Sequence, residues 1–193
     1  MTAELVFFNE AEARDVEALA ARIVPGDADD PGAREAGVLV YIDRAVEGTY
    51  RDLQSAYRRG LAELERHCRE EARASFADLG VDRQDALLTE LDRVALALEA
   101  GEDAVSDPRH VVLAQLYEMV RQHTLEGLLA DPAYGGNRGG AGWRLVGFPG
   151  AQWGYSAEQM APGFDATTIP VKTLADLRGE HGARRSERTA ARP

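Results

Sequence analysis

The side chains that could do chemistry in this sequence are few, and they fall at helical spacings. Glu63 and His67 are four positions apart and His123 and Glu126 are three apart, so each pair can share one helix face. A carboxylate beside an imidazole could hold a metal ion or move a proton. A di-iron bundle, however, needs two Glu-x-x-His motifs, and the sequence contains none. Hydrogen bonding on helix surfaces or in the core is therefore the favoured role of the histidines.

A covalent mechanism has no better support. Cys68 is the only cysteine, so the chain can form no internal disulfide. Its neighbour His67 is one position away, which turns the two side chains about 100° apart around a helix. Leu61 and Leu64 lie at helical spacing from Cys68, which favours a buried structural thiol. The sequence also contains no Gly-x-Ser-x-Gly nucleophile elbow. No catalytic, cofactor-binding or metal-binding residue is predicted.

The glycine-rich stretch "DPAYGGNRGGAGWRLVGFPG", residues 131–150, could bind a phosphate or a protein surface. It has no Gly-x-x-x-x-Gly-Lys motif, and the Gly140–Gly142 pair would need a third glycine where Leu145 stands. Glycines let a backbone approach another surface closely, while the interleaved aromatic rings can fill pockets. The residue types therefore predict either docking on a partner or a strap over the protein's own helices, and they leave both open.

The remaining pattern is helical, and it predicts an all-α fold of about five to six helices. Asn9 and Glu12 have capping-box spacing before an apolar stripe that Pro25-Gly26 ends. Further helices are expected through residues 38–46, from about 50 to 71, and from an N-cap at Asp82. Asp107 and Pro108 are typical of a helix start, and the helix they begin should reach about Leu129.

The chain after residue 150 predicts a different kind of structure. Pro162 and Pro170 exclude a continuous helix, so residues 151–177 are expected to form an extended strap. Arginines dominate residues 178–193, which are expected to form a basic, flexible tail. The predicted organisation is a helical domain over 1–150, which includes the glycine-rich loop 131–150, followed by the strap and the tail.

The charge and hydropathy of the chain exclude several classes of partner. Its formal net charge of −11 disfavours nucleic acid and anionic membranes, which attract basic surfaces. The sequence contains no run of 18 or more apolar residues, the length that a membrane-spanning helix needs. The first residues, "MTAELVFFNE", show no basic region, apolar core or cleavage site of an export signal. As written, the sequence therefore predicts a cytoplasmic protein.

Three blocks of sequence resemble a known family. The first, between residues 7 and 46, contains "RIVP", "PGAREAG" and "YID"; the second, which is weaker, contains "YRRGL" and "LLTEL". The third and most specific is "HTLEGLLADPAYGGN", followed by Gly-Trp and then by Gly-Phe-Pro-Gly. Together they span roughly residues 5–153. They are similar to the gluconate 2-dehydrogenase subunit 3 family, the small or gamma subunit of flavin-dependent sugar and polyol dehydrogenases.

The resemblance implies a non-catalytic subunit that carries no cofactor. Its partner would be a large subunit of the glucose-methanol-choline oxidoreductase type, which holds FAD and abstracts the hydride. In many such complexes a cytochrome subunit takes the electrons onward. The small subunit of the family assists maturation of the large one and, in exported complexes, often supplies a twin-arginine signal. This sequence shows no twin arginine before Phe7, so a cytoplasmic complex is expected, with a periplasmic, exported complex as the alternative.

The expected docking element is the loop 131–150, with Trp143 and Phe148 pointing outward and Trp143 as an anchor. Side chains on the last turns of the preceding helix, namely His123, Thr124 and Glu126, are expected to brace the loop by hydrogen bonds to its backbone. The alternative function is a stand-alone helical enzyme or metal-binding protein. The predicted partner-binding residues are Tyr134, Gly135, Gly136, Asn137, Trp143, Phe148, Pro149, Gly150 and Trp153.

Overall fold

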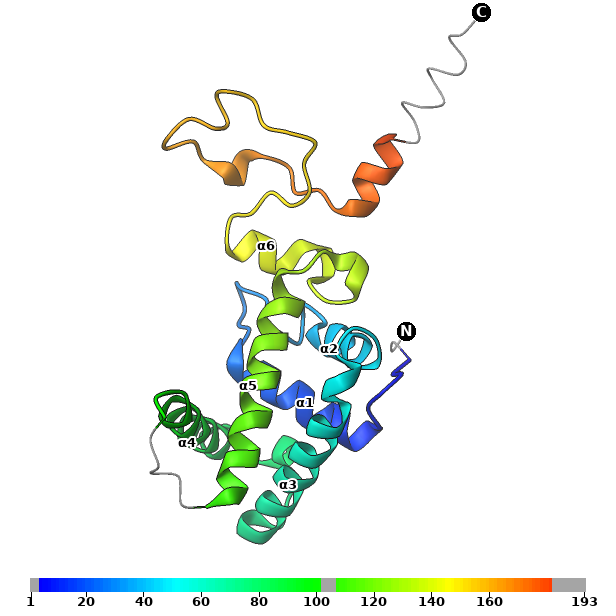
Figure 1. Ribbon diagram of the computed structural model, residues 1–193. Helices are drawn as coiled ribbons and strands as arrows, with labels where there is room; N and C mark the ends of the chain where they lie inside the picture. The colour runs from blue at the N-terminus through cyan, green and yellow to red at the C-terminus, as the bar shows by residue number, and fades with distance from the viewer. Residues whose placement is uncertain (1–3, 102–106, 182–193) are drawn as a thin grey trace, which may run out of the picture.

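The computed structural model describes residues 4–101 and 107–181, and its regular structure there is entirely helical (Figure 1). This confirms the predicted all-α class. Short 3-10 turns join or follow the longer helices, among them η1 (Arg51–Leu53) and η2 (Phe76–Asp78). The α-helices are α1 (Glu10–Ile23), α2 (Val38–Glu47), α3 (Gln54–Ala72), α4 (Val81–Glu99), α5 (Pro108–Leu129) and α6 (Ala141–Leu145).

Helix α5 is the axis of the molecule. It packs against α1, α2, α3 and α4, and the core lies around it (Figure 1). Its buried positions include Leu113, Leu116 and Val120 along most of its length. At Gly60 of α3, an added Cβ atom would lie 2.8 Å from the Leu116 side chain, so glycine there lets α3 pass close to α5.

The predicted helix starts are confirmed where a side chain supplies the cap. Asn9 and Glu12 form both hydrogen bonds of a capping box, and the Asp107 side chain accepts the Arg109 amide with Pro108 in the first turn. The predicted N-cap at Asp82 is wrong. Helix α4 begins one residue before it and is preceded by Gly80, whose carbonyl accepts the amides of Arg83 and Gln84. Helix α3 starts at Gln54 rather than near residue 50, because η1 forms a tighter turn first.

The buried carboxylate of Asp43 fixes the N-terminal segment to the helical body. Asp43 lies on α2, is 1% exposed, and accepts the backbone amides of Val6, Phe7 and Phe8 at 2.7–3.0 Å. These bonds hold the Phe8 ring against Tyr57 in an edge-to-face contact with centroids 5.6 Å apart. A carboxylate is well suited here, because it accepts several amides at once and gains from their partial positive charge.

The chain after α6 leaves the helical body rather than lying across it (Figure 1). The expectation of an extended strap over 151–177 is wrong for its last residues. Its middle projects into solvent, with Trp153 57% and Met160 68% exposed. Its end is helical, because residues 174–181 form a helix whose first turn is capped by Asp176 and Thr173. Of the expected flexible tail, 178–181 belong to that helix, and 182–193 lie outside the described residues.

We predict that Asp43→Ala lowers the free energy of unfolding by about 3 kcal/mol, because three backbone donors lose a charged acceptor. Urea denaturation followed by circular dichroism measures the loss. The matched control is Asp52→Ala, at an exposed position of η1, which should change stability by less than about 0.5 kcal/mol. Equal losses in the two variants would contradict the anchoring role of Asp43.

Candidate partner-docking surface

The loop 131–150 folds back over the C-terminal end of α5 and satisfies its last carbonyl groups. A helix leaves its final carbonyls without intrahelical donors, and a buried end must find them elsewhere. The Trp143 indole nitrogen donates to Leu129 O at 2.7 Å, and the Asn137 amide donates to Ala130 O at 2.8 Å. Asn137 also accepts the Gly142 amide at 2.8 Å and is fully buried in a left-handed conformation, with φ 45°. The loop is thus a cap for α5.

Two glycines let the loop approach the end of α5 closely. A Cβ atom added to Gly136 would lie 2.1 Å from the carbonyl oxygen of Gly127, and one added to Gly142 would lie 2.0 Å from that of Leu128. Both distances are far shorter than any normal contact, and both obstacles are backbone atoms that cannot rotate away. Neither glycine has a positive φ, so steric space alone requires glycine at these positions.

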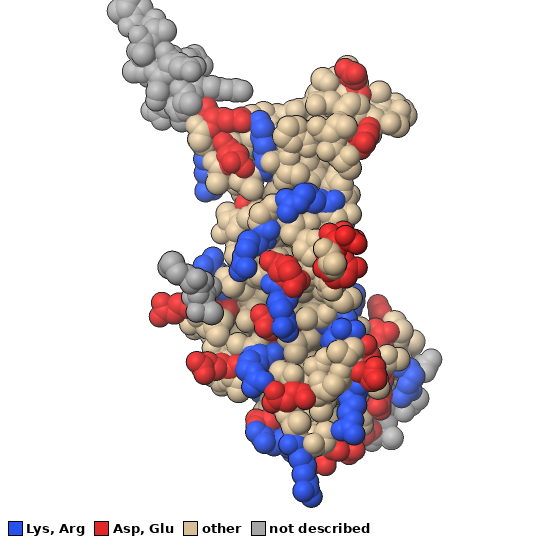
Figure 2. Space-filling model, turned by 180° about the vertical axis from the view of Figure 1, so that it is seen from behind, with Lys and Arg blue, Asp and Glu red and all other residues tan. Residues whose placement is uncertain are grey.

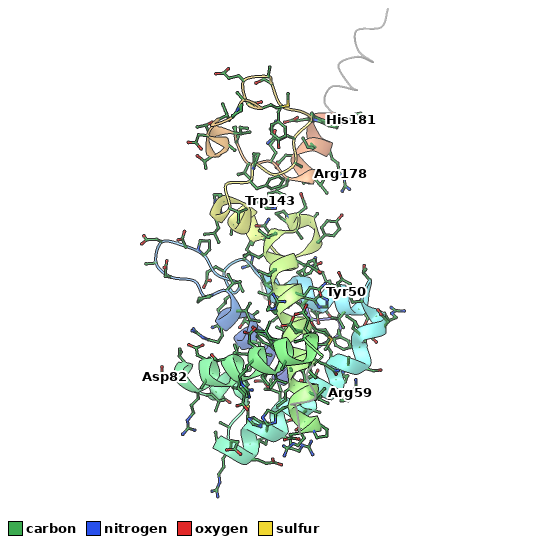
Figure 3. The ribbon with its side chains drawn as sticks, turned by 60° about the vertical axis from the view of Figure 1, so that its left-hand side comes forward. Tyr50, Arg59, Asp82, Trp143, Arg178 and His181 are labelled. Carbon is green, nitrogen blue, oxygen red and sulfur yellow. The ribbon has the colours of Figure 1, made fainter. Side chains whose placement is uncertain are left out.

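Trp143 points inward, and its predicted outward direction is wrong. It lies on α6, is 5% exposed, and packs edge-to-face with Phe148 at a centroid distance of 5.5 Å (Figure 3). The reason is its hydrogen bond to Leu129, which draws the indole over the end of α5. Phe148 is 46% exposed, so its predicted outward direction is confirmed.

The other predicted partner-binding residues divide in the same way. Tyr134 and Trp153 are exposed at 59% and 57%, and Gly135 is half-buried. The remainder are buried within the chain and are unavailable as first contacts for another protein: Gly136, Asn137, Pro149 and Gly150.

The predicted bracing by helix side chains is also wrong. Glu126 accepts the hydroxyl groups of Tyr41 and Tyr50, both at 3.0 Å, so its carboxylate serves α2 and the turn that follows α2. The His123 ring stacks on Tyr50 and shares a 2.8 Å hydrogen bond with the Tyr57 hydroxyl. Thr124 is fully buried, and its hydroxyl has no hydrogen-bond partner in the structure. These side chains point into the helical body because α2 and α3 pack on that face of α5.

This buried cluster shifts the pKa values of its members. Burial, followed by the hydrogen bond and the charge of Glu126, raises the pKa values of Tyr41 and Tyr50. Burial lowers the pKa of His123, although the nearby charge of Glu126 opposes that shift. The tyrosines therefore remain neutral donors, and the imidazole is held neutral between aromatic rings.

Asp131 makes the brace that the sequence reasoning missed. One carboxylate oxygen accepts the Ala133 amide at 2.9 Å, and the other accepts the Leu174 amide at 2.8 Å. The first hydrogen bond closes an Asx turn, which the Asp-Pro pair after a helix indicates in the sequence. The second joins residues 43 positions apart, and no local pattern reports such a contact.

Exposed apolar side chains gather at the end of the molecule where α5 stops. Residues 141–171 contain only three charged side chains, while 28% of the whole chain is charged. Figure 2 shows this end as a largely uncharged surface above a body covered with mixed charges. We call this region the apolar end, and its exposed large apolar residues are Leu125, Leu129, Tyr134, Leu145, Val146, Phe148, Trp153, Tyr155 and Met160.

A capped, glycine-rich turn at this place in the chain matches a family pattern. The sequence model described as Gluconate 2-dehydrogenase subunit 3 matches residues 10–150, which are most of the chain. The chain belongs to this family. The match ends where the glycine-rich loop ends, so the apolar end lies partly inside and partly outside the family region. No curated protein and no solved structure matches the chain.

The part of the chain that the structure describes contains few side chains suited to catalysis or metal binding. Cys68 is buried, and burial raises the pKa of its thiol to about 11, which keeps it protonated and unreactive. The predicted structural role of this thiol is confirmed. His110 contacts Asp107 and Glu90 on the surface. Residues 4–101 and 107–181 contain no group of three or more potential metal ligands, and none of their helices is long and apolar enough to cross a bilayer.

We predict that Gly142→Ala lowers the free energy of unfolding by about 2 kcal/mol or more, because its methyl group would collide with Leu128 O. Thermal unfolding measures this loss, and the fluorescence of Trp143 should shift to longer wavelength as the loop lifts from α5. Gly154→Ala is the control, because an added Cβ there meets nothing within 4 Å. A stable Gly142→Ala variant with unchanged fluorescence would contradict the capping role of the loop.

We predict that His123 makes the protein less stable as pH falls through about 6.5, the pKa of an exposed imidazole. Folding lowers the pKa of His123 below that of an exposed imidazole. As the pH falls, the unfolded chain therefore binds the proton first, and the unfolded state becomes more stable relative to the native state. One such group changes the free energy of unfolding by up to about 1.4 kcal/mol per pH unit. Urea titrations at pH 7 and pH 5 should show a smaller difference for His123→Gln than for the unsubstituted protein. An equal difference would exclude His123 as the source.

Proposed function

We propose that this protein is the non-catalytic small subunit of an FAD-dependent dehydrogenase. It binds a large subunit of the glucose-methanol-choline type and assists its maturation. The observation that carries the proposal is the apolar end, where aromatic side chains stand in solvent on a chain that otherwise has a highly charged surface. Membership of the gluconate 2-dehydrogenase subunit 3 family supports the assignment of a dehydrogenase complex.

The apolar end supports a permanent rather than a transient partner. Monomeric proteins seldom expose contiguous apolar patches larger than a few hundred Å². Permanent complexes commonly bury about 2,000 Å² or more, and their interfaces are more apolar than those of transient ones. The mixed-charge helical body is suited to contact with water, and the apolar end is suited to being covered.

Membership of the family supports a division of labour within the proposed complex. FAD and the substrate site belong to the large subunit, and a cytochrome subunit, where one is present, contacts this protein only through the complex. A partner that binds the folded large subunit and not its unfolded chain stabilises the folded state by mass action, and this is the physical basis for assisted maturation. We propose that the pair forms in the cytoplasm, and export of an assembled complex is the alternative.

Co-expression with a flavoprotein large subunit of the glucose-methanol-choline type from the same genome tests the proposal. A tag on this protein should retain a large subunit in stoichiometric amount, and absorption near about 450 nm, the position of oxidised flavin, should appear only in the pair. The large subunit expressed without this protein should give a lower yield of soluble, flavin-loaded material. Flavin or stoichiometric iron in the small protein purified alone would contradict the proposal, as would a pair that separates at micromolar concentration.

A further inference from the structure

Residues 151–171 form a closed loop that stands away from the helical body, and we call it the arm (Figure 1). Its two ends meet at the bridge between Gly150 and Lys172, where Ala151 N donates to Lys172 O at 2.7 Å and Lys172 N donates to Pro149 O at 3.1 Å. Gln152 adds a side-chain bond to each end, to Pro149 O and to the carbonyl of residue 170. The arm therefore has a closed, hydrogen-bonded base.

The base of the arm is attached to the body at a fixed place. The Leu174 amide donates to Asp131, which also shapes the turn after α5. Glu180, on the helix of residues 174–181, accepts from Lys172 at 2.6 Å and from the indole of Trp153 at 3.1 Å. Gly150 has φ +74°, and an added Cβ would lie 2.1 Å from Lys172 O, so no other residue fits the closed base. The position of the arm thus depends on the same loop that caps α5.

The surface of the arm is apolar and almost uncharged. Tyr155 and Met160 are 42% and 68% exposed, and Trp153 keeps 57% of its surface exposed beside Glu180. The charged residues of the arm are Glu158 and Asp165. Exposed aromatic and methionine side chains with few neighbouring charges are typical of the central contacts of protein interfaces.

We propose that the arm is a recognition element that inserts into an apolar hollow of the flavoprotein large subunit, with Tyr155 and Met160 as its main contacts. This inference rests on the proposed function and adds the location of the contact. The arm lies outside residues 10–150, which the family model matches.

A second copy of this chain is a poorer occupant than the flavoprotein. The arm exposes roughly 300 Å² on its three large apolar side chains, well below the ~800 Å² that each partner of a stable pair usually buries. The hollow beside α1 and α3 suits an apolar arm from another copy poorly, because charged groups such as Glu12, Arg14 and Arg58 line most of it. Each copy also carries a net charge of −11, which opposes self-association.

The flavoprotein, in contrast, can cover the arm together with the rest of the apolar end. Phe148 and Val146 lie just before the base of the arm and are 46% and 61% exposed. A single partner that covers both regions buries more apolar surface than one that covers the arm alone, and permanent interfaces are large. Continuity of the two regions therefore favours one large partner.

The test uses the full-length protein co-expressed with its flavoprotein and purified through a tag on the small chain. The double variant Tyr155→Ser/Met160→Ser removes apolar surface from the arm and leaves its hydrogen-bonded base intact. It should lower the affinity for the large subunit at least about tenfold, with unchanged helix content. The matched control is Val81→Ser/Leu96→Ser, which removes equally exposed apolar residues from α4 at the other end of the body and should pair normally.

A photo-crosslinking residue placed at position 160 gives an independent readout, because it requires no loss of folding or affinity. It should form a product with the large subunit, and the same residue at position 96 should not. Normal pairing of the arm variant, or no crosslink from position 160 within an intact pair, overturns the role of the arm and leaves the proposed function standing. Crosslinking of two small chains instead identifies a second copy as the occupant. Failure of the unsubstituted protein to retain any flavoprotein overturns both proposals.

Discussion

The loop that follows α5 covers the carbonyl groups at its C-terminal end, and those groups must find donors within the chain. An unsatisfied buried carbonyl would cost on the order of 1–3 kcal/mol, so the residues that follow are constrained to return over the helix end. Trp143 and Asn137 donate to the last two of these groups, and Gly136 and Gly142 let the backbone come close enough for them to do so. The glycine-rich composition of the loop follows from this requirement, and a phosphate or metal ligand is not needed to explain it.

A second constraint acts along the side of α5 that faces α2 and α3. The hydroxyls of Tyr41 and Tyr50 converge on Glu126, and His123 fills the space between Tyr50 and Tyr57. Burial makes every one of these groups costly unless it is paired, so the cluster specifies a single arrangement of three helices. Because α5 is held on this side and capped at its end, the direction of the chain that leaves it is also fixed.

The features that sequence reasoning predicted correctly are local. The capping box at Asn9, the Asp107-Pro108 start and the burial of Cys68 each depend on residues within about one turn. The errors concern longer distances or competing local turns. Trp143 looked like an exposed anchor because its acceptor, Leu129, lies fourteen positions away across a reversal that no periodicity describes. Likewise, Glu126 was expected to support the next segment, but the two tyrosines that donate to it come from more than 70 positions earlier in the chain.

Trp143 and the pair Tyr155 and Met160 therefore have different physical roles, although all three are large apolar side chains in the last third of the chain. Trp143 lies where a carbonyl group at a helix end needs a donor, so its indole ring is buried within the fold of this chain. Tyr155 and Met160 lie beyond the closed base at Gly150, and their side chains remain exposed to solvent. The family pattern ends at the same glycine. The capping loop thus positions the base of the segment that follows it, and that segment extends into solvent away from the helical core. The surface of such an element can change while the structure that positions it stays the same.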